Sequence, residues 1–200
     1  MTEYPQPPIG EHVVHRIGLS DRRVGGVRLV CIDGPAGSGK TTYASALAAA
    51  LAPAYGAVPI VHGDEVYEGW PVVEQAGDRL LAFAELGRRL TTWLVTPWEQ
   101  GYDAEYPRWN WHAGAWDDSV RVPAAAVVIL EGVGLGQSAL RSKAALTVWV
   151  DAEESLRLPR VLARDGEAIR DEMIAWQRDE QAWFTLDGTL AGADVVVVTG

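Results

Sequence analysis

The chain contains the stretch Gly34-Pro35-Ala36-Gly37-Ser38-Gly39-Lys40-Thr41-Thr42, and this stretch decides the fold. It begins with the pattern G-x-x-x-x-G-K-[ST], whose backbone N–H groups turn inward around a phosphate chain. Residues 27–33 before it are typical of a short buried strand, and residues 42–51 after it are typical of a helix. The pattern requires this strand–loop–helix context, so the stretch predicts a phosphate-binding P-loop.

The predicted loop would bind a nucleoside triphosphate through its backbone and two of its side chains. A side chain at Gly34 or Gly39 would obstruct the phosphate, and the following helix adds its N-terminal dipole. Lys40 is expected to reach the β- and γ-phosphates, and the Thr41 hydroxyl is expected to hold Mg²⁺. Nucleotide binding is therefore predicted across Gly34, Pro35, Ala36, Gly37, Ser38, Gly39, Lys40, Thr41 and Thr42.

Composition favours one intracellular domain over residues 1–200. A chain of 200 residues can bury one core of ordinary size. The formal net charge of -10 argues against a nucleic-acid polymer as a partner. The N-terminus lacks a signal-peptide profile, and no apolar run approaches the ~20 residues that span a bilayer. We expect a cytoplasmic protein that does not bind a membrane.

Strand-like and helix-like segments alternate along the chain, which is typical of a parallel sheet with helices on both faces. Further strands are predicted at 57–62, 124–130, 145–150 and 193–198, and helices at 74–95, 137–143, 152–164 and 167–184. The expected fold class is α/β, a three-layer P-loop NTPase fold with a five-stranded parallel sheet and a helical lid over 157–184. Residues 96–122 do not fit the alternation and predict an irregular acceptor-side loop. Residues 1–26 are an N-terminal extension with no assigned role.

Two carboxylates follow predicted strands at the edge of the sheet where ligands bind. Asp64 lies just past the second strand, where a carboxylate can take the proton of a hydroxyl acceptor. Glu131 ends the third strand, where it can hold Mg²⁺ directly or through water. Glu65 is an alternative base, and solvated loop carboxylates are the alternative for both positions.

Arginines concentrate in the predicted lid. Spacings of three and four place Arg157, Arg160 and Arg164 on one helix face, and Arg170 follows. Such a cluster can clamp a triphosphate and neutralise the charge that develops during transfer, with Arg157 contacting the nucleotide. The alternative is a solvated face paired with neighbouring acidic side chains.

Nine tryptophans in 200 residues are far above the usual share. Four of them, with Tyr102 and Tyr106, crowd the irregular segment at Trp98, Trp109, Trp111 and Trp116. Aromatic rings can sandwich a nucleobase, with Asn110 or His112 available for hydrogen bonds. The alternative is that most of these rings pack the segment onto the core. His62 and His112 have no zinc-like spacing, so no zinc site is predicted.

Ile32 to Thr42 resembles the opening of the P-loop nucleoside and nucleotide kinases, and the similarity extends from about Val27 to the C-terminus. Asp64-Glu65-Val66-Tyr67 is similar to the D-x-F-Y element of uridine kinases, and Glu131-Gly132 to their E-G. Tyr67 to Trp70 is shared with the actinobacterial branch. Residues 106–111 stand where that family has an acceptor loop, and Arg157-x-x-Arg160-x-x-x-Arg164-Asp165 resembles the start of its lid.

The resemblance implies an ATP-dependent kinase that uses Mg²⁺ and transfers the γ-phosphoryl group to a nucleoside 5′-hydroxyl, as in uridine or cytidine. It implies a catalytic role for Lys40, Asp64, Arg160 and Arg164, a metal role for Thr41 and Glu131, and acceptor contacts from Asp64, Tyr67, Trp109, Asn110 and Arg170. The partner would be a small-molecule acceptor, and a homodimer is left open. Val66, Asn110 and Gly114 differ from the family pattern, and these differences concern the acceptor.

Two other functions are left open by the residues. A nucleoside monophosphate acceptor would require basic side chains between the second and third strands, and Arg79, Arg88, Arg89 and Arg108 lie there; a sugar or another small metabolite is a further acceptor class. A nucleotide-dependent switch or binding protein is the third hypothesis, although the chain has no N-K-x-D motif for guanine.

Overall fold

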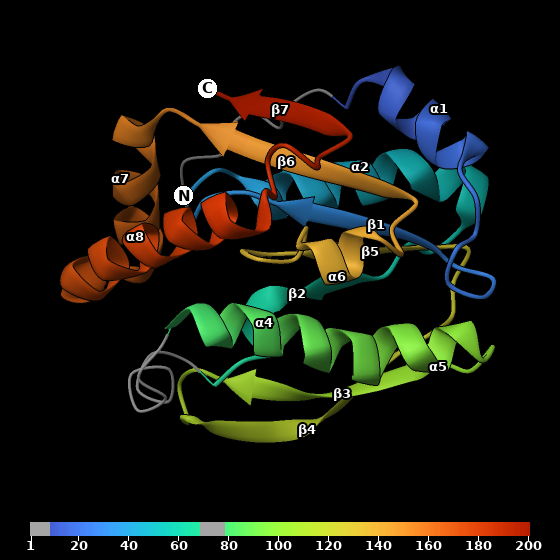
Figure 1. Cartoon of the computed structure of the whole chain (residues 1–200), viewed down its shortest axis with the longest axis horizontal. Helices are drawn as coiled ribbons and strands as arrows, with labels where there is room; N and C mark the ends of the chain where they lie inside the picture. The colour runs from blue at the N-terminus through green and yellow to red at the C-terminus, as the bar shows by residue number, and fades with distance from the viewer. Residues whose placement is uncertain (1–8, 69–78) are drawn as a thin grey trace.

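The computed structural model describes residues 9–68 and 79–200, and a five-stranded sheet organises them. All pairings in this sheet are parallel, and the strand order is β2-β5-β1-β6-β7 (Figure 1). The strands are β1 Arg28–Asp33, β2 Ile60–His62, β5 Val127–Glu131, β6 Leu146–Ala152 and β7 Val195–Thr199. The predicted α/β fold with a five-stranded parallel sheet is confirmed.

The helices follow the predicted alternation. They are α1 Glu11–Leu19, α2 Lys40–Tyr55, α4 Arg79–Leu90, α5 Thr96–Glu99, α6 Ser138–Arg141, α7 Glu154–Asp165 and α8 Arg170–Asp187. A π-helical stretch, Thr91–Val95, joins α4 to α5, and short 3-10 turns lie at Gly63–Glu65 and Glu167–Ile169. The first part of the helix predicted from residue 74 lies outside the described residues. Within the described part of the chain, no helix has the length and hydropathy to cross a membrane.

Alternate residues of the central strands supply two separate hydrophobic clusters. In β1, Val30 and Ile32 pack with α1 and α2, whereas Leu29 and Cys31 pack with the helical segment from α4 to α5. All five residues of β5 are buried. Burial on both faces explains why these strands read as continuous apolar runs in the sequence.

The N-terminal extension contains a helix that belongs to the core. Val13 and Ile17 of α1 are buried and pack in the same cluster as Leu47 and Leu51 of α2. Their spacing of four residues places them on one helix face. Residues 1–26 had no predicted role, and α1 within them covers part of one face of the sheet.

The prediction of an irregular segment over residues 96–122 was wrong. This segment forms α5 and an antiparallel hairpin of β3 Ala104–Asn110 and β4 Ala115–Val122, with the register shifting between Pro107 and Trp109. Figure 1 shows the hairpin below α4. Its buried residues Ala104, Tyr106 and Val122 join the cluster formed with Trp98. The strands were not predicted because β4 is exposed along most of its length, so the sequence lacks the apolar alternation that marks a half-buried strand. The tryptophan, proline and glycine residues of the segment indicated a loop instead.

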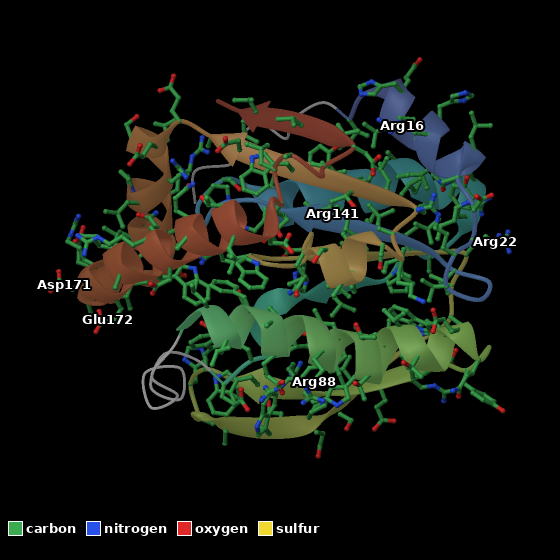
Figure 2. All side chains as sticks on the ribbon, in the orientation of Figure 1. Arg16, Arg22, Arg88, Arg141, Asp171 and Glu172 are labelled. Atoms are coloured by element: carbon green, nitrogen blue, oxygen red, sulfur yellow. The ribbon has the colours of Figure 1, made fainter. Side chains whose placement is uncertain are left out.

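Helix α8 packs on the same face of the sheet as α4. Trp183 and Phe184 on α8 form a third cluster with Phe83 on α4 and Trp149 on β6. The first turn of α8 lies at the outer edge of the molecule, where Glu172 is exposed (Figure 2). The helix therefore extends from solvent into the region beside the P-loop.

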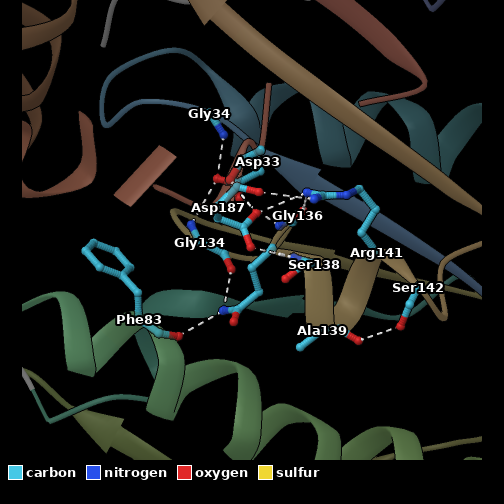
Figure 3. A network of polar contacts seen from close by, with 12 residues as sticks. Asp33, Gly34, Phe83, Gly134, Gly136, Ser138, Ala139, Arg141, Ser142 and Asp187 are labelled. Carbon is cyan, nitrogen blue, oxygen red and sulfur yellow. Dashed lines mark hydrogen bonds and ion pairs between the residues drawn. The ribbon is translucent and has the colours of Figure 1, made fainter. Parts of the chain in front are cut away.

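A buried carboxylate joins the end of β1 to the loop after β5. Asp33 is fully buried, and its Oδ1 accepts hydrogen bonds from the backbone N–H groups of Gly34 at 2.7 Å and Gly134 at 2.9 Å. Its Oδ2 accepts one from Gly136 N–H at 2.7 Å (Figure 3). Burial raises the pKa of Asp33 to about 6, although the three hydrogen bonds and the charge on Lys40 act in the opposite direction.

Replacing Asp33 with alanine is expected to destabilise the fold by about 3 kcal/mol or more, because three buried N–H groups lose their acceptor. Chemical denaturation measures this loss. Asp118→Ala, at an exposed position of β4, is the matched control and should change the free energy of unfolding by less than about 0.5 kcal/mol. Equal losses in the two variants would contradict the clamping role of Asp33.

Candidate active site around the P-loop

The P-loop closes tightly over the start of α2. The φ values of the loop glycines are positive: 143° at Gly34, 81° at Gly37 and 92° at Gly39. Residues other than glycine rarely adopt such values, because their Cβ clashes with the backbone. The buried Lys40 ammonium donates hydrogen bonds of 2.9 Å to both the Gly34 and Pro35 carbonyl oxygens. The loop is thereby folded around its own lysine at the carboxyl edge of the sheet.

Neighbouring backbone leaves no room for a Cβ at two of these glycines. A Cβ on Gly34 would lie 1.9 Å from the Val150 carbonyl oxygen, and a Cβ on Gly37 would lie 2.2 Å from the Arg157 carbonyl oxygen. Strand β6 and helix α7 therefore touch the loop directly. The loop shape and the position of α7 depend on the same small residues.

Glu131 lies at the centre of a short hydrogen-bonded row. Its Oε1 accepts from the Thr41 hydroxyl at 3.0 Å and lies 2.6 Å from His62 Nδ1. Burial alone would raise the pKa of Glu131, but the hydrogen bond with His62 and the charge on Lys40 hold that pKa below its ordinary value. The same hydrogen bond raises the pKa of His62. The row thus favours an ionised carboxylate beside the P-loop.

Asp64 lies beside this row, in the 3-10 turn that follows β2. Asp64 is an exposed residue, and its pKa is raised by the partial loss of water around the carboxylate and by the charge on Glu131, whereas Lys40 and Arg164 act in the opposite direction. The Trp111 indole N–H donates to the Asp64 carbonyl oxygen at 2.8 Å. The hairpin therefore touches the turn that carries Asp64.

Glu65, the other candidate for the base, is bonded to the hairpin. Its Oε2 accepts a hydrogen bond of 2.5 Å from the Tyr106 hydroxyl, and Tyr106 is nearly fully buried. The Glu65 carboxylate is therefore hydrogen-bonded to a residue of β3, whereas the charges on Lys40 and Glu131 act on Asp64.

Asp64 lines a small hollow. Aromatic and apolar groups dominate its lining, which includes Asp64, Tyr67, Phe83, Leu86, Val133 and Trp176. The Tyr67 ring stacks on Trp176 with centroids 5.7 Å apart and meets the edge of Trp111 at 5.5 Å. The tryptophans beside the candidate base are therefore Trp111 and Trp176. Trp70 lies outside the described residues.

Of the residues predicted to contact an acceptor, Tyr67 lines the hollow. Trp109 and Asn110 instead make contacts within the β3–β4 hairpin. Trp109 packs edge-on against Trp116 at 5.3 Å. The Asn110 side chain donates to Asp117 at 3.1 Å and accepts from the His112 and Ala113 backbone N–H groups at 3.0 Å. Asn110 therefore shapes the turn between β3 and β4. This role could not be predicted, because the partners of the Asn110 side chain depend on the hairpin turn, and the hairpin itself was not predicted.

The four predicted lid arginines do not form one cluster around the loop. The charge of Arg164 acts on Asp64 and Glu131, while its guanidinium bonds Asp165 at 2.6 Å. Arg160 donates to Thr199 Oγ1 at 3.1 Å and so contacts the end of β7. Arg157 packs its backbone on Gly37, as described above. Arg170 bonds Glu167 at 2.7 Å at the outer end of α8.

Sequence reasoning missed Glu180 on α8, which reaches the P-loop. It is 1% exposed, and its two carboxylate oxygens lie 3.0 and 3.2 Å from the Ala36 N–H nitrogen, which donates to them. Burial raises the pKa of Glu180 to about 7, and the charge on Lys40 acts most strongly in the opposite direction. Helical periodicity marks Glu180 as a buried position but does not show that it faces a loop 144 residues away in sequence.

Comparison with solved structures supports the assignment of the fold. A proposed uridine kinase from Bacillus stearothermophilus superposes with a TM-score of 0.63 at 16% identity, covering 94% of this chain and 96% of that chain. The chain has a uridine-kinase-like P-loop fold. A protein from Silicibacter sp. TM1040, whose name proposes a fructose transport system kinase, superposes with a TM-score of 0.58 at 20% identity and covers 93% and 95% of the two chains. No protein-family model and no curated protein matches the sequence.

The residues at the loop fit a magnesium–nucleotide complex. Glycines with positive φ let backbone N–H groups face a phosphate chain, and Lys40 lies at the start of α2. The Thr41 hydroxyl and Glu131 carboxylate oxygens are 3.0 Å apart, about the spacing of two neighbouring ligands in an octahedron with bonds of ~2.1 Å. Magnesium in such sites takes few protein ligands, with phosphates and water completing the shell. Among the described residues, no group of three or more His, Cys, Asp or Glu could hold a metal.

The raised pKa of Glu180 makes stability depend on pH. Ionisation costs the folded state more than the unfolded chain, so stability should fall as pH rises from about 4.5 to about 7. Glu180→Gln cannot ionise, so its stability lacks this pH dependence. The free energy of unfolding of the variant minus that of the wild type should therefore be larger at pH 8 than near pH 4.5, by on the order of 3 kcal/mol. Urea denaturation at the two pH values measures the difference. Parallel pH profiles for the two proteins would contradict a raised pKa at this position.

Proposed function

We propose that the protein is an ATP-dependent small-molecule kinase that transfers the γ-phosphoryl group to a nucleoside 5′-hydroxyl of the uridine or cytidine kind. One observation carries this proposal. The charge on Lys40 of the P-loop acts on Asp64, and Asp64 also forms part of the wall of the small aromatic hollow. A carboxylate in that place adjoins both the P-loop and a set of aromatic side chains. The hollow has a volume of about 10 Å³, so these side chains would have to move apart to admit an acceptor.

The roles of the residues follow from this placement. Asp64 accepts the proton of the acceptor hydroxyl as the hydroxyl oxygen attacks the γ-phosphorus, and its raised pKa makes it a stronger base than an ordinary aspartate. Lys40 and Arg164 neutralise charge that develops on the transferring group. Thr41 and Glu131 hold Mg²⁺, which when bound neutralises charge on the β- and γ-phosphate oxygens. Helices α7 and α8 act as the lid that excludes water.

The acceptor side of the site favours an uncharged acceptor over a nucleoside monophosphate. Arg89 is bonded to Glu68 at 2.6 Å and to Glu85 at 3.0 Å. Arg88 is also bonded to Glu85, and Arg108 is paired with Asp117 at 3.5 Å. These arginines are already matched to carboxylates, so binding an acceptor phosphate would require breaking ion pairs. The side chain of Arg79 lies outside the described residues.

The aromatic wall of the hollow supports a flat acceptor. Phe83, Tyr67 and Trp176 form a continuous set of ring contacts, with Phe83 and Trp176 5.1 Å apart. Such rings can bind the face of a base, and Asp64 lines the same hollow as these rings. A homodimer and a cytoplasmic location remain predictions.

The proposal is tested by measuring ADP release from MgATP with a panel of nucleosides, nucleoside monophosphates and simple sugars. Turnover with a pyrimidine nucleoside should exceed the acceptor-free rate by at least ~10²-fold, because the base needs a hydroxyl proton to accept. A preference for a monophosphate or a sugar would contradict the proposed acceptor and keep the kinase chemistry. A rate that no acceptor raises would contradict the kinase.

The role of Asp64 is tested by Asp64→Asn. This variant should bind MgATP with nearly unchanged affinity and turn over ~10²-fold or more slowly, because the amide cannot take a proton. Lys40→Ala should lower both affinity and turnover. Asp118→Asn, an exposed change of the same kind, should leave both unchanged. A fully active Asp64→Asn enzyme would overturn the assignment of the base.

A further inference from the structure

Glu180 places a carboxylate among hydrogen-bond donors that the fold provides for phosphate. The carboxylate shares the Ala36 N–H between its two oxygens, at 3.0 and 3.2 Å, and is 1% exposed. Ala36 belongs to the same loop as the other N–H groups expected to face the triphosphate. A protein carboxylate and a phosphate chain therefore converge on one loop.

The charges that face Glu180 come from each element packed around it. Lys40 at the start of α2 and Arg157 of α7 favour the ionised form, and Asp33 at the end of β1 opposes it. The Lys40 ammonium donates to the Gly34 and Pro35 carbonyls in this structure. A bound triphosphate would draw Lys40 to itself and add several negative charges close to Glu180 in a place largely shielded from water. Both changes disfavour the carboxylate form.

We propose that Glu180 is a built-in competitor of the triphosphate at the P-loop, and that the nucleotide binds together with a proton that neutralises this side chain. This inference rests on the proposed function, because it requires that the loop bind ATP. The proton comes from solvent and adds to one carboxylate oxygen. The other oxygen still accepts from the Ala36 N–H, so α8 stays connected to the loop when the repulsion is removed.

The proposal predicts a definite pH dependence of binding. If only the protonated form of Glu180 admits the nucleotide, the apparent Kd rises with the ionised fraction of this group in the free protein. With a pKa of about 7, the apparent Kd should be about tenfold higher at pH 8 than the Kd of the protein with Glu180 protonated. At pH 6 the two Kd values should be nearly equal. Glu180→Gln keeps an acceptor oxygen and removes the charge. It should therefore bind MgATP about tenfold more tightly than the wild type at pH 8.

The experiment is calorimetric titration of the full chain with MgATP, without acceptor, at pH 6 and pH 8. At pH 8 the titration is repeated in two buffers with different heats of ionisation, which gives the number of protons taken up. The wild type should take up close to one proton more than Glu180→Gln. Glu172→Gln makes the same change at an exposed position of the same helix and should behave as the wild type.

The outcomes separate the inference from the proposed function. MgATP binding with equal affinity and equal proton uptake in wild type and Glu180→Gln would overturn the competitor role and leave the kinase proposal intact. If the wild type fails to bind MgATP, the proposed function and this inference both fail. Should Glu180→Gln not fold, the wild type alone decides, because absence of proton uptake at pH 8 contradicts the proposal.

Discussion

Backbone packed against backbone at the P-loop is the constraint on which the rest of the structure depends. Gly34 meets the Val150 carbonyl and Gly37 meets the Arg157 carbonyl at distances that leave no space for a methyl group. Strand β6 and helix α7 are thus placed by the loop itself. Asp33 fixes the other side of the loop to the segment after β5. Contacts with β6, α7 and the segment after β5 therefore fix the shape of the loop without a bound ligand.

One ammonium group acts on four carboxylates near the P-loop, in a chain of net charge -10. The charge on Lys40 acts on Asp33, Asp64, Glu131 and Glu180 alike. Their pKa values nevertheless move in different directions. Glu131 forms hydrogen bonds with His62 and Thr41 that lower its pKa, whereas His62 acts on Asp64 only through its charge. The surroundings of these acids therefore separate Glu131, whose pKa is lowered, from Asp33, Asp64 and Glu180, whose pKa values are raised.

Local sequence patterns predicted the sheet, the P-loop and the alternation of elements, because apolar runs and the glycine pattern are set within a few residues. The residues predicted at strand ends, Asp64 and Glu131, lie together as parallel strands require. What the sequence could not show depends on long-range packing. Nothing near Glu180 marks it as a partner of Ala36, and nothing near Asn110 marks it as the cap of a turn. The arginine spacing predicted one shared face but not the separate partners that each side chain found.

The β3–β4 hairpin has a consequence for how such a protein can change. Its interior packs on Trp98 of α5 and on the π-helical stretch. It contacts the turn that carries Asp64 through the Trp111 indole N–H on the Asp64 carbonyl, the Tyr106–Glu65 hydrogen bond and the edge of Trp111 on Tyr67. The P-loop is assembled from other elements, with β6 and α7 packed against it. Mutation can therefore remodel the hairpin while the P-loop and its neighbours remain as they are. The architecture is modular, and in a kinase of the proposed kind the choice of acceptor could change while the transfer chemistry is kept.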